Sequence, residues 1–173
     1  MTASDAASAG LQGAQRTLAI ASVLAAMVLV VLSAAVSNVA LPELSRALQV
    51  TPGASVRVIS AYQMALVMAL LPCAALGESL GYRRVFSAGV ALFTAASAAC
   101  MLAPSLGWLV AARLVQGLGG AAVMALGVAL LRFTVSSQQL GAAIGWNALT
   151  VALSSAAGPT LGALILSRAA WPW

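Results

Sequence analysis

The sequence predicts an all-α integral membrane protein with five membrane-spanning helices. Apolar residues make up 62% of its 173 residues and charged residues only 6%, whereas a soluble domain carries roughly a quarter charged residues. There is too little charge to cover a surface that faces water. The apolar residues also fall in long blocks, and each block is about long enough to cross a hydrocarbon layer of roughly 30 Å.

The boundaries of the blocks define the expected organisation. Residues 1–16 are rich in Ser, Ala, Gly and Gln, and we predict a flexible cytoplasmic tail there. Residues 17–173 are expected to form one bundle. Because the first block follows Arg16, a cleaved secretory signal is an alternative, but the block is long for a signal and more blocks follow it. The predicted helices span residues 17–41, 58–77, 85–103, 108–131 and 140–166.

Short segments connect the predicted helices. Residues 42–56 contain two prolines and two charged residues, which predicts a polar connection. Residues 104–107, Pro-Ser-Leu-Gly, form a turn signal without charge, and residues 132–139 are expected to form a short loop. Trp171 and Trp173 near the end of the chain suit a membrane interface, where amphipathic rings prefer the headgroup level.

Orientation is predicted from the arginines, because positive residues in short loops tend to stay cytoplasmic. The loop between the second and third helices carries Arg83 and Arg84, while residues 104–107 carry no arginine. We therefore expect a multi-pass protein of the cell membrane with a cytoplasmic N-terminus. The net charge of +5 comes from arginines scattered between apolar blocks. Anionic lipid headgroups explain this pattern better than nucleic acid does.

The fourth predicted helix carries an arginine inside its apolar block. Arg113 begins a series at helical spacing that shares one face of the helix. A guanidinium inside a bilayer costs at least about 2.5 kcal/mol, so Arg113 is expected to face a cavity or a partner. The alternative is that it lies near enough to the outer interface to snorkel there. The members of this face are Arg113, Gln116, Gly117, Gly120, Met124 and Gly127.

The fifth predicted helix has small residues at fourfold spacing. Ser154, Gly158 and Gly162 form the small-xxx-small pattern that lets helix backbones approach closely. Pro159 removes a backbone hydrogen bond and is expected to kink the helix. Close packing alone and a direct part in function remain open for this face.

The residue constellations of soluble enzymes are missing, so we predict no enzyme activity, no cofactor and no metal site. The chain has no histidine, which leaves no Ser/His or Cys/His pair and no histidine metal ligand. Its three acidic residues, Asp5, Glu43 and Glu78, are too far apart for paired carboxylate catalysis. Cys73 and Cys100 are expected at different depths and are interpreted as packed thiols.

Four segments resemble, in order, signatures of a known transporter family. Residues 32–42 are similar to the first-helix signature L-D-x-T-x-x-N-V-A-L-P, and residues 74–86 to the loop G-x-L-a-D-r-x-G-r-r between helices two and three. Residues 109–119 resemble the fourth-helix signature around its Arg and Gln-Gly pair. The fifth-helix antiporter spacing is reproduced by Gly145, Ser154, Gly158, Pro159 and Gly162. The chain thus resembles the N-terminal part of a major facilitator superfamily transporter, most like the fourteen-helix multidrug:proton antiporters.

This resemblance implies roles for individual residues. Arg113, with Gln116, would line a central cavity and take part in proton coupling. Gly158 and Pro159 would shape a helix that changes its packing between inward-open and outward-open states. The loop motif would latch the two halves of a transporter on the cytoplasmic side. That motif contains Gly77, Glu78, Gly81, Arg83 and Arg84, and the first-helix motif contains Ser33, Asn38 and Pro42.

The chain also departs from the family pattern. Ser33 stands where the family has an Asp, which removes an ionisable group, and Glu78 replaces the loop Asp. The resemblance implies a first bundle of six helices, of which this chain supplies five, and a second bundle facing it. We therefore expect a fragment, inactive alone, of a transporter that exports drugs or other small molecules by proton antiport. The alternative is a small non-transporting membrane protein that packs with partner helices through its glycine-rich faces.

Overall fold

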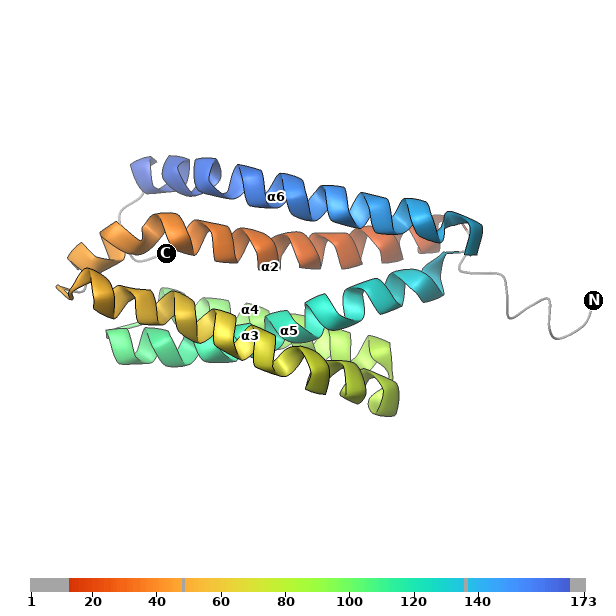
Figure 1. The fold of residues 1–173 in the computed structure, drawn as a ribbon, viewed down its shortest axis with the longest axis horizontal. Helices are drawn as coiled ribbons and strands as arrows, with labels where there is room; N and C mark the ends of the chain where they lie inside the picture. Colours follow the sequence, from red (N-terminus) through yellow and green to blue (C-terminus); the bar gives the residue numbers. More distant parts are fainter. Residues whose placement is uncertain (1–12, 48, 136, 169–173) are drawn as a thin grey trace, which may run out of the picture.

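The fold consists of long helices that run back and forth along one axis. The computed structural model describes residues 13–47, 49–135 and 137–168. It contains α2 (Gly13–Ala47), α3 (Pro52–Leu80), α4 (Tyr82–Met101), α5 (Leu106–Thr134) and α6 (Leu140–Arg168), with the short 3₁₀ helix η1 (Ser137–Gln139) before α6 (Figure 1). Each of the five long helices contains a stretch long and apolar enough to cross a membrane. The predicted all-α membrane fold with five spans is therefore confirmed.

The first helix is longer than predicted at both ends. It begins at Gly13, so residues 13–16 are helical where a flexible tail was expected, while residues 1–12 lie outside the described residues. It also continues through Pro42 to Ala47, and α3 starts at Pro52, so the expected connection over residues 42–56 is wrong in extent. The physical reason is that a proline removes one backbone hydrogen bond and bends a helix without having to end it.

The loop expected between the second and third spans is a turn of one residue. Gly81 alone separates α3 from α4, and its φ of +96° is a conformation that favours glycine. Its N–H donates to the carbonyl of Gly77 at 3.0 Å, while its own carbonyl accepts from the N–H of Arg84 at 3.1 Å. At this turn α3 therefore continues past the predicted end at residue 77, and α4 begins before the predicted start at residue 85, while the far end of α4 at Met101 falls short of the predicted residue 103.

The N-termini of α3 and α5 are each capped by a side-chain hydroxyl. The hydroxyl of Ser105 accepts from the N–H of Trp108 at 3.3 Å and caps α5. The break predicted at residues 104–107 is present but lies earlier, because α4 ends at Met101 and α5 begins at Leu106. Thr51 caps α3 in the same way through the N–H of Ala54 at 3.3 Å, and Pro52 occupies the first helical position. Trp171 and Trp173 lie outside the described residues.

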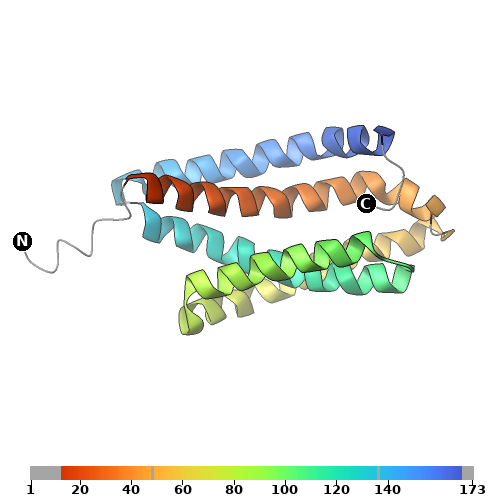
Figure 2. The same ribbon diagram turned by 180° about the vertical axis from the view of Figure 1, so that it is seen from behind.

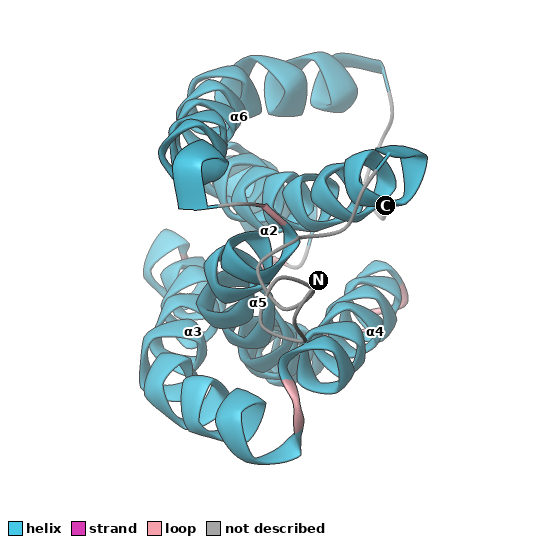
Figure 3. Ribbon diagram, turned by 90° about the vertical axis from the view of Figure 1, so that its right-hand side faces the viewer, coloured by secondary structure: helices cyan, strands magenta, loops and turns pink. Residues whose placement is uncertain are grey.

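Helix α5 lies at the centre of the packing. Its most extensive contacts are with α3 and α4, whereas α6 packs mainly on α2 (Figures 2 and 3). Glycines bring the backbones together: a Cβ added at Gly119 would lie 2.6 Å from the backbone nitrogen of Phe93 in α4, and one at Gly117 would meet the backbone of Tyr62 in α3. This is the small-residue packing expected between helices that share a lipid environment.

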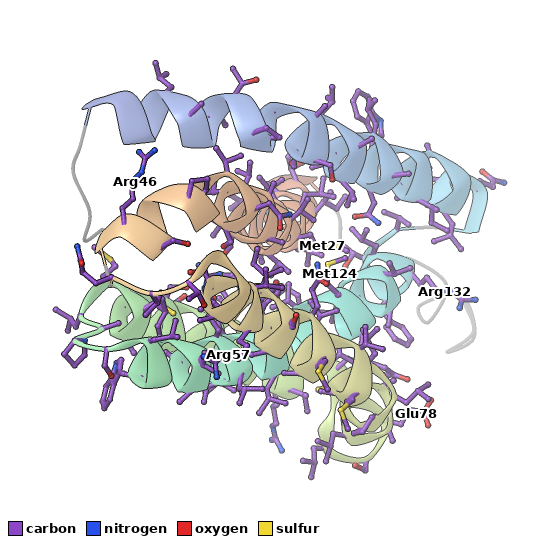
Figure 4. The ribbon with its side chains drawn as sticks, turned by 60° about the vertical axis from the view of Figure 1, so that its left-hand side comes forward. Met27, Arg46, Arg57, Glu78, Met124 and Arg132 are labelled. Carbon is purple, nitrogen blue, oxygen red and sulfur yellow. The ribbon has the colours of Figure 1, made fainter. Side chains whose placement is uncertain are left out.

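Apolar side chains cover both the inside and the outside of the bundle. Leu109, Leu126 and Leu131 are almost fully buried, while Leu71 is 82% exposed and Met68 is 73% exposed. Such exposure suits a surface that faces lipid. Figure 4 shows the Met27 and Met124 side chains among the helices, in contrast to Glu78 and Arg132 at one end. Both cysteines are free thiols. Cys100 is buried, as expected of a packed thiol, whereas Cys73 is only half-buried.

Candidate functional site

A cluster of four polar side chains joins three helices inside the bundle. The hydroxyl oxygen of Ser33 in α2 accepts from Arg113 Nη1 at 3.4 Å and from Gln116 Nε2 at 3.3 Å, both in α5. Gln116 Nε2 also donates to the hydroxyl oxygen of Ser97 in α4 at 2.7 Å. We call Ser33, Ser97, Arg113 and Gln116 the polar cluster. Its guanidinium reaches α2 through the interior of the bundle.

The serine of α4 is oriented by its own helix. Its hydroxyl donates to the carbonyl of Phe93 at 2.7 Å, so the lone pairs of the oxygen remain free to accept from Gln116. Gln116 is 2% exposed. Two atoms of the cluster, Arg113 Nε and Gln116 Oε1, are buried without a hydrogen-bond partner among the described residues. A buried polar atom left unpaired costs roughly 1–3 kcal/mol, so the cluster is not saturated.

The arginine of the cluster has no carboxylate beside it in the described part of the chain. Glu78 is exposed at the far end of α3, and Glu43 lies about 15 Å further along α2 than Ser33. Asp5, the third acidic residue, falls outside the described residues. The ionisable side chains near enough to Arg113 for electrostatic interaction include Tyr62 and Cys100. The hydrogen bond that the Arg113 guanidinium makes to Ser33 is therefore to an uncharged group.

The glycine-rich face of α5 is buried as a unit. Gln116, Gly117, Gly120 and Gly127 are buried, while Arg113 and Met124 are half-buried. A Cβ at Gly120 would lie 3.2 Å from the Tyr62 hydroxyl, and one at Gly127 would lie 2.8 Å from Met27 Sδ. The face predicted from helical spacing thus packs between α2 and α3.

A cavity of about 500 Å³ lies between α2, α3, α5 and α6, and none of the four residues of the polar cluster is among its lining residues. Its wall is mainly apolar, and its polar side chains are neutral. Tyr62 lines it and donates from its hydroxyl to the carbonyl of Val30 at 3.4 Å. Arg113 does not line the cavity. Tyr62 does, and it also lies close enough to Arg113 for electrostatic interaction. The polar lining residues are Asn38, Tyr62, Gln63 and Ser155, and Pro159 is also in the wall.

The residues of the fifth-helix motif are placed differently from one another. A Cβ at Gly158 would overlap Ala35 of α2, and one at Gly162 would lie 3.5 Å from the Cα of Val36. Ser154 is buried, and its hydroxyl donates to the carbonyl of Thr150 at 2.7 Å. Gly145, in contrast, is exposed, and a Cβ there would meet no atom of the described residues within 4 Å. Pro159 lies inside the continuous helix α6.

The loop motif surrounds the turn between α3 and α4. Gly77 is buried because the side chain of Leu126 occupies the space where a Cβ would be, and Gly81 forms the turn. Arg83 and Arg84 are exposed, and with Gly81 they line a second cavity of about 920 Å³ between the ends of α2, α4 and α5. Of the first-helix motif, Ser33 belongs to the polar cluster, Asn38 lines the smaller cavity, and Pro42 is exposed.

Comparison with known proteins identifies the fold. The sequence model of the Major Facilitator Superfamily matches residues 23–173. This chain belongs to that superfamily. The match runs from the first half of α2 to the end of the sequence, and it confirms the superfamily that the four sequence signatures indicated.

Individual members of the superfamily show how much of a transporter this chain covers. It is 44% identical over 164 residues to the uncharacterized transporter YebQ of Escherichia coli, and this alignment covers 95% of the chain but 36% of YebQ. It is also 36% identical over 81 residues to the multidrug resistance protein Stp of Mycobacterium tuberculosis, covering 47% of the chain and 15% of Stp. Methyl viologen resistance protein SmvA of Salmonella typhimurium is 33% identical over 82 residues, covering 47% of the chain and 17% of SmvA. The chain thus spans about a third of the length of YebQ.

Two residues of the site escaped the sequence analysis. Ser97 accepts the shortest hydrogen bond between side chains of the polar cluster. Tyr62 lines the cavity and lies close enough to Arg113 for electrostatic interaction. Polar side chains in otherwise apolar helices are the available signal, because such residues tend to face the interior of a bundle. The spacing within α3 or α4 alone does not tell which of their faces meets α5.

Proposed function

We propose that this chain is part of a transporter of the fourteen-helix type that exports drug-like small molecules in exchange for protons. The observation that carries the proposal is the polar cluster, a buried arginine and glutamine held by serines of two other helices. Polar and charged groups within membrane spans are costly and mark substrate and ion pathways. Superfamily membership and the names of the relatives Stp and SmvA, a multidrug resistance protein and a methyl viologen resistance protein, support export of small molecules.

In this proposal the polar cluster and the cavity are the part of the central site that the first helix bundle contributes. Arg113 supplies a fixed positive charge, and Gln116 couples it to α4 through Ser97. Because Ser33 cannot titrate, the proposal assigns the exchanged proton to a group other than position 33, supplied by the remaining helices of the complete transporter. Small-molecule substrate and protons are thus partners of the complete protein, and the lipid bilayer is the partner of the chain itself.

The α2–α6 contact is suited to a change of packing. Gly158 and Gly162 lie directly on α2 without interlocking side chains, and Pro159 sits in the cavity wall between them. Transporters of this kind work by rocking one bundle against another around a site near the midplane. We propose that α6 slides along α2 at this glycine face during the movement, and that Pro159 bends α6.

Orientation and the latch complete the proposal. Arg83 and Arg84 are exposed at the turn between α3 and α4, at the same end of the bundle as Arg132. Because positive residues in short loops tend to stay in the cytoplasm, we assign this end of the bundle, and with it the N-terminus, to the cytoplasmic side of the cell membrane. Glu78 is exposed there and is free to approach the positive end of a helix of the second half.

The alternative of a non-transporting interaction protein receives less support. It assigns the glycine-rich faces to partner helices from other chains. Gly117, Gly119 and Gly158 instead lie against neighbouring helices of the same chain, with no space left for a Cβ. The faces that were expected to bind partners are therefore already occupied.

A reconstitution experiment tests the proposed function. The chain, alone and together with the remaining helices of its complete transporter, is purified into proteoliposomes, and uptake of a fluorescent drug is followed under an imposed pH gradient. We expect proton-dependent transport by the complete protein, a loss on Arg113→Gln, and none by the chain alone. Proton-dependent, Arg113-sensitive transport by the chain alone would contradict the fragment interpretation, and pH-independent uptake by the complete protein would contradict antiport.

A further inference from the structure

We propose that the polar cluster binds the anionic group of an amphipathic organic anion, so that the substrates of this transporter are organic anions rather than cations. This inference rests on the proposed transport function and names its substrate class. It follows from the charges around Arg113, from the unfilled hydrogen bonds of the cluster and from the cavity whose wall includes Tyr62, a neighbour of Arg113.

The first argument is the charge balance inside the membrane. Arg113 lies within the span of α5, and the acidic residues of the described chain lie elsewhere: Glu43 about 15 Å further along α2 than Ser33, and Glu78 exposed at the other end of the bundle. Burying a charge without an opposite charge is costly. An anion that enters the bundle would relieve this cost, while a cation would increase it.

The second argument is the state of the hydrogen bonds. Arg113 donates to one neutral oxygen, that of Ser33, over a long distance of 3.4 Å, and its Nε has no partner among the described residues. A guanidinium presents a planar set of donors that fits a carboxylate or phosphate with two parallel bonds. The weakly held guanidinium is therefore available for a better acceptor than a hydroxyl.

The third argument is the room for the rest of the molecule. The cavity of about 500 Å³ has the size of a site for a drug-sized ligand. Its polar lining residues Asn38, Tyr62 and Gln63 are uncharged, and Tyr62 also lies close enough to Arg113 for electrostatic interaction. An apolar body fits against this wall while an anionic group points past Tyr62 toward the guanidinium.

Ser33 is the residue that determines this preference. Its hydroxyl oxygen occupies the position from which a carboxylate would form an ion pair with Arg113, since the two side chains already touch at 3.4 Å. A carboxylate at position 33 would neutralise the site and leave it able to accept a cation. The serine leaves the positive charge uncompensated, so a dication such as methyl viologen would be repelled.

Binding to the purified chain tests the inference without any transport. Fluorescence anisotropy of carboxyfluorescein, an anionic aromatic probe, is compared with that of the cationic probe rhodamine 6G, with the chain in nanodiscs of neutral lipid. We expect the chain to prefer the anionic probe. Arg113→Gln and Ser33→Asp are each expected to weaken anionic binding at least tenfold, the second by supplying an internal counter-ion, while Arg113→Lys retains part of it. Arg57→Gln is the matched control, because Arg57 is an exposed arginine near the start of α3.

The variants also separate the possible outcomes. Ser33→Asp keeps every existing charge and adds the missing one, so it remains informative if Arg113→Gln fails to fold. Equal binding of both probes, or anionic binding that survives both substitutions, overturns the inference. So does a wild-type chain that binds no anionic probe, whether or not Ser33→Asp stabilises it. Anionic binding by a complete protein that transports nothing would instead leave the site chemistry intact and contradict the proposed function.

Discussion

Replacing Gly119 by alanine tests how closely α4 and α5 pack. A Cβ at this position would lie 2.6 Å from the backbone nitrogen of Phe93, 2.8 Å from the carbonyl oxygen of Gly89 and 2.9 Å from the Cα of Phe93. All three are backbone atoms, so a rotamer change cannot relieve the clash. Contacts between heavy atoms are most favourable near about 3.5–4.0 Å, so α4 must retreat by on the order of 1 Å.

The magnitude follows from this shift. Overpacking of a well-packed interior costs typically about 1–3 kcal/mol, and a gap of up to about 1 Å forfeits a quarter to a half of each contact that α4 makes with α5. The higher helix propensity of alanine offsets up to about 1 kcal/mol. Gly107→Ala is the matched control, because a Cβ at Gly107 near the start of the same helix would meet no described atom within 4 Å. Because Gly107 lies in the first turn of α5, alanine gains less helix propensity there than at Gly119, so the difference between the two variants is somewhat smaller than the overpacking cost of about 1–3 kcal/mol.

Unfolding of the purified chain in mixed micelles measures this difference. Helix content is followed by circular dichroism while sodium dodecyl sulfate is added, and in a Cys73→Ser background a maleimide that reacts with buried Cys100 reports the opening of the α4–α5 contact. We expect Gly119→Ala to unfold at a lower detergent fraction than both wild type and Gly107→Ala. Equal midpoints for the two alanine variants would show that α4 and α5 do not approach as closely as the structure indicates.

Three further predictions follow from single positions. Gly81→Ala is expected to destabilise the chain by about 1–3 kcal/mol, measured in the same unfolding assay, because a residue with a side chain rarely adopts the φ of 96° and ψ of 127° of this turn. Gly158→Leu should separate α6 from α2 and raise the protease sensitivity of α6, whereas Gly145→Leu, at an open position, should not; equal cleavage would contradict the contact. A membrane-permeant thiol reagent should modify half-buried Cys73 faster than buried Cys100, and the reverse order would contradict their burial.

The number and centres of the helices were predictable because they depend on length and apolarity alone. A block that can cross the bilayer must be helical, since lipid offers no partner to unpaired backbone groups. The ends were less predictable, because they depend on local backbone chemistry. Pro42 was interpreted as a break but lies inside α2, and the charged segment around Arg83 is the first turn of α4, since Gly81 alone makes the reversal.

The candidate site was predictable only in part. Arg113 and Gln116 were found because they are three residues apart on one helix, and this spacing places them on one face whatever surrounds it. Ser33 was indicated by the resemblance to a signature in which the family has an Asp. Ser97 and Tyr62 were missed, because their roles depend on which faces of α3 and α4 meet α5. That choice is made by the close glycine contacts along α5, which no pattern within a single helix encodes.

The change from a carboxylate to a hydroxyl at position 33 affects more than one residue. An aspartate would hold the guanidinium by itself, whereas a hydroxyl oxygen accepts from both Arg113 and Gln116 and satisfies neither fully, since Arg113 Nε and Gln116 Oε1 stay unpaired within the described structure. Gln116 is then held in place chiefly by its 2.7 Å bond to Ser97. Ser97→Ala should therefore loosen Gln116 and alter anion binding only where position 33 is a serine. In the Ser33→Asp background the same substitution should have little effect, because the added carboxylate orients both side chains. A double-mutant cycle between positions 33 and 97, measured with the anionic probe, detects this dependence as non-additivity, and strictly additive effects would show that the two serines act independently.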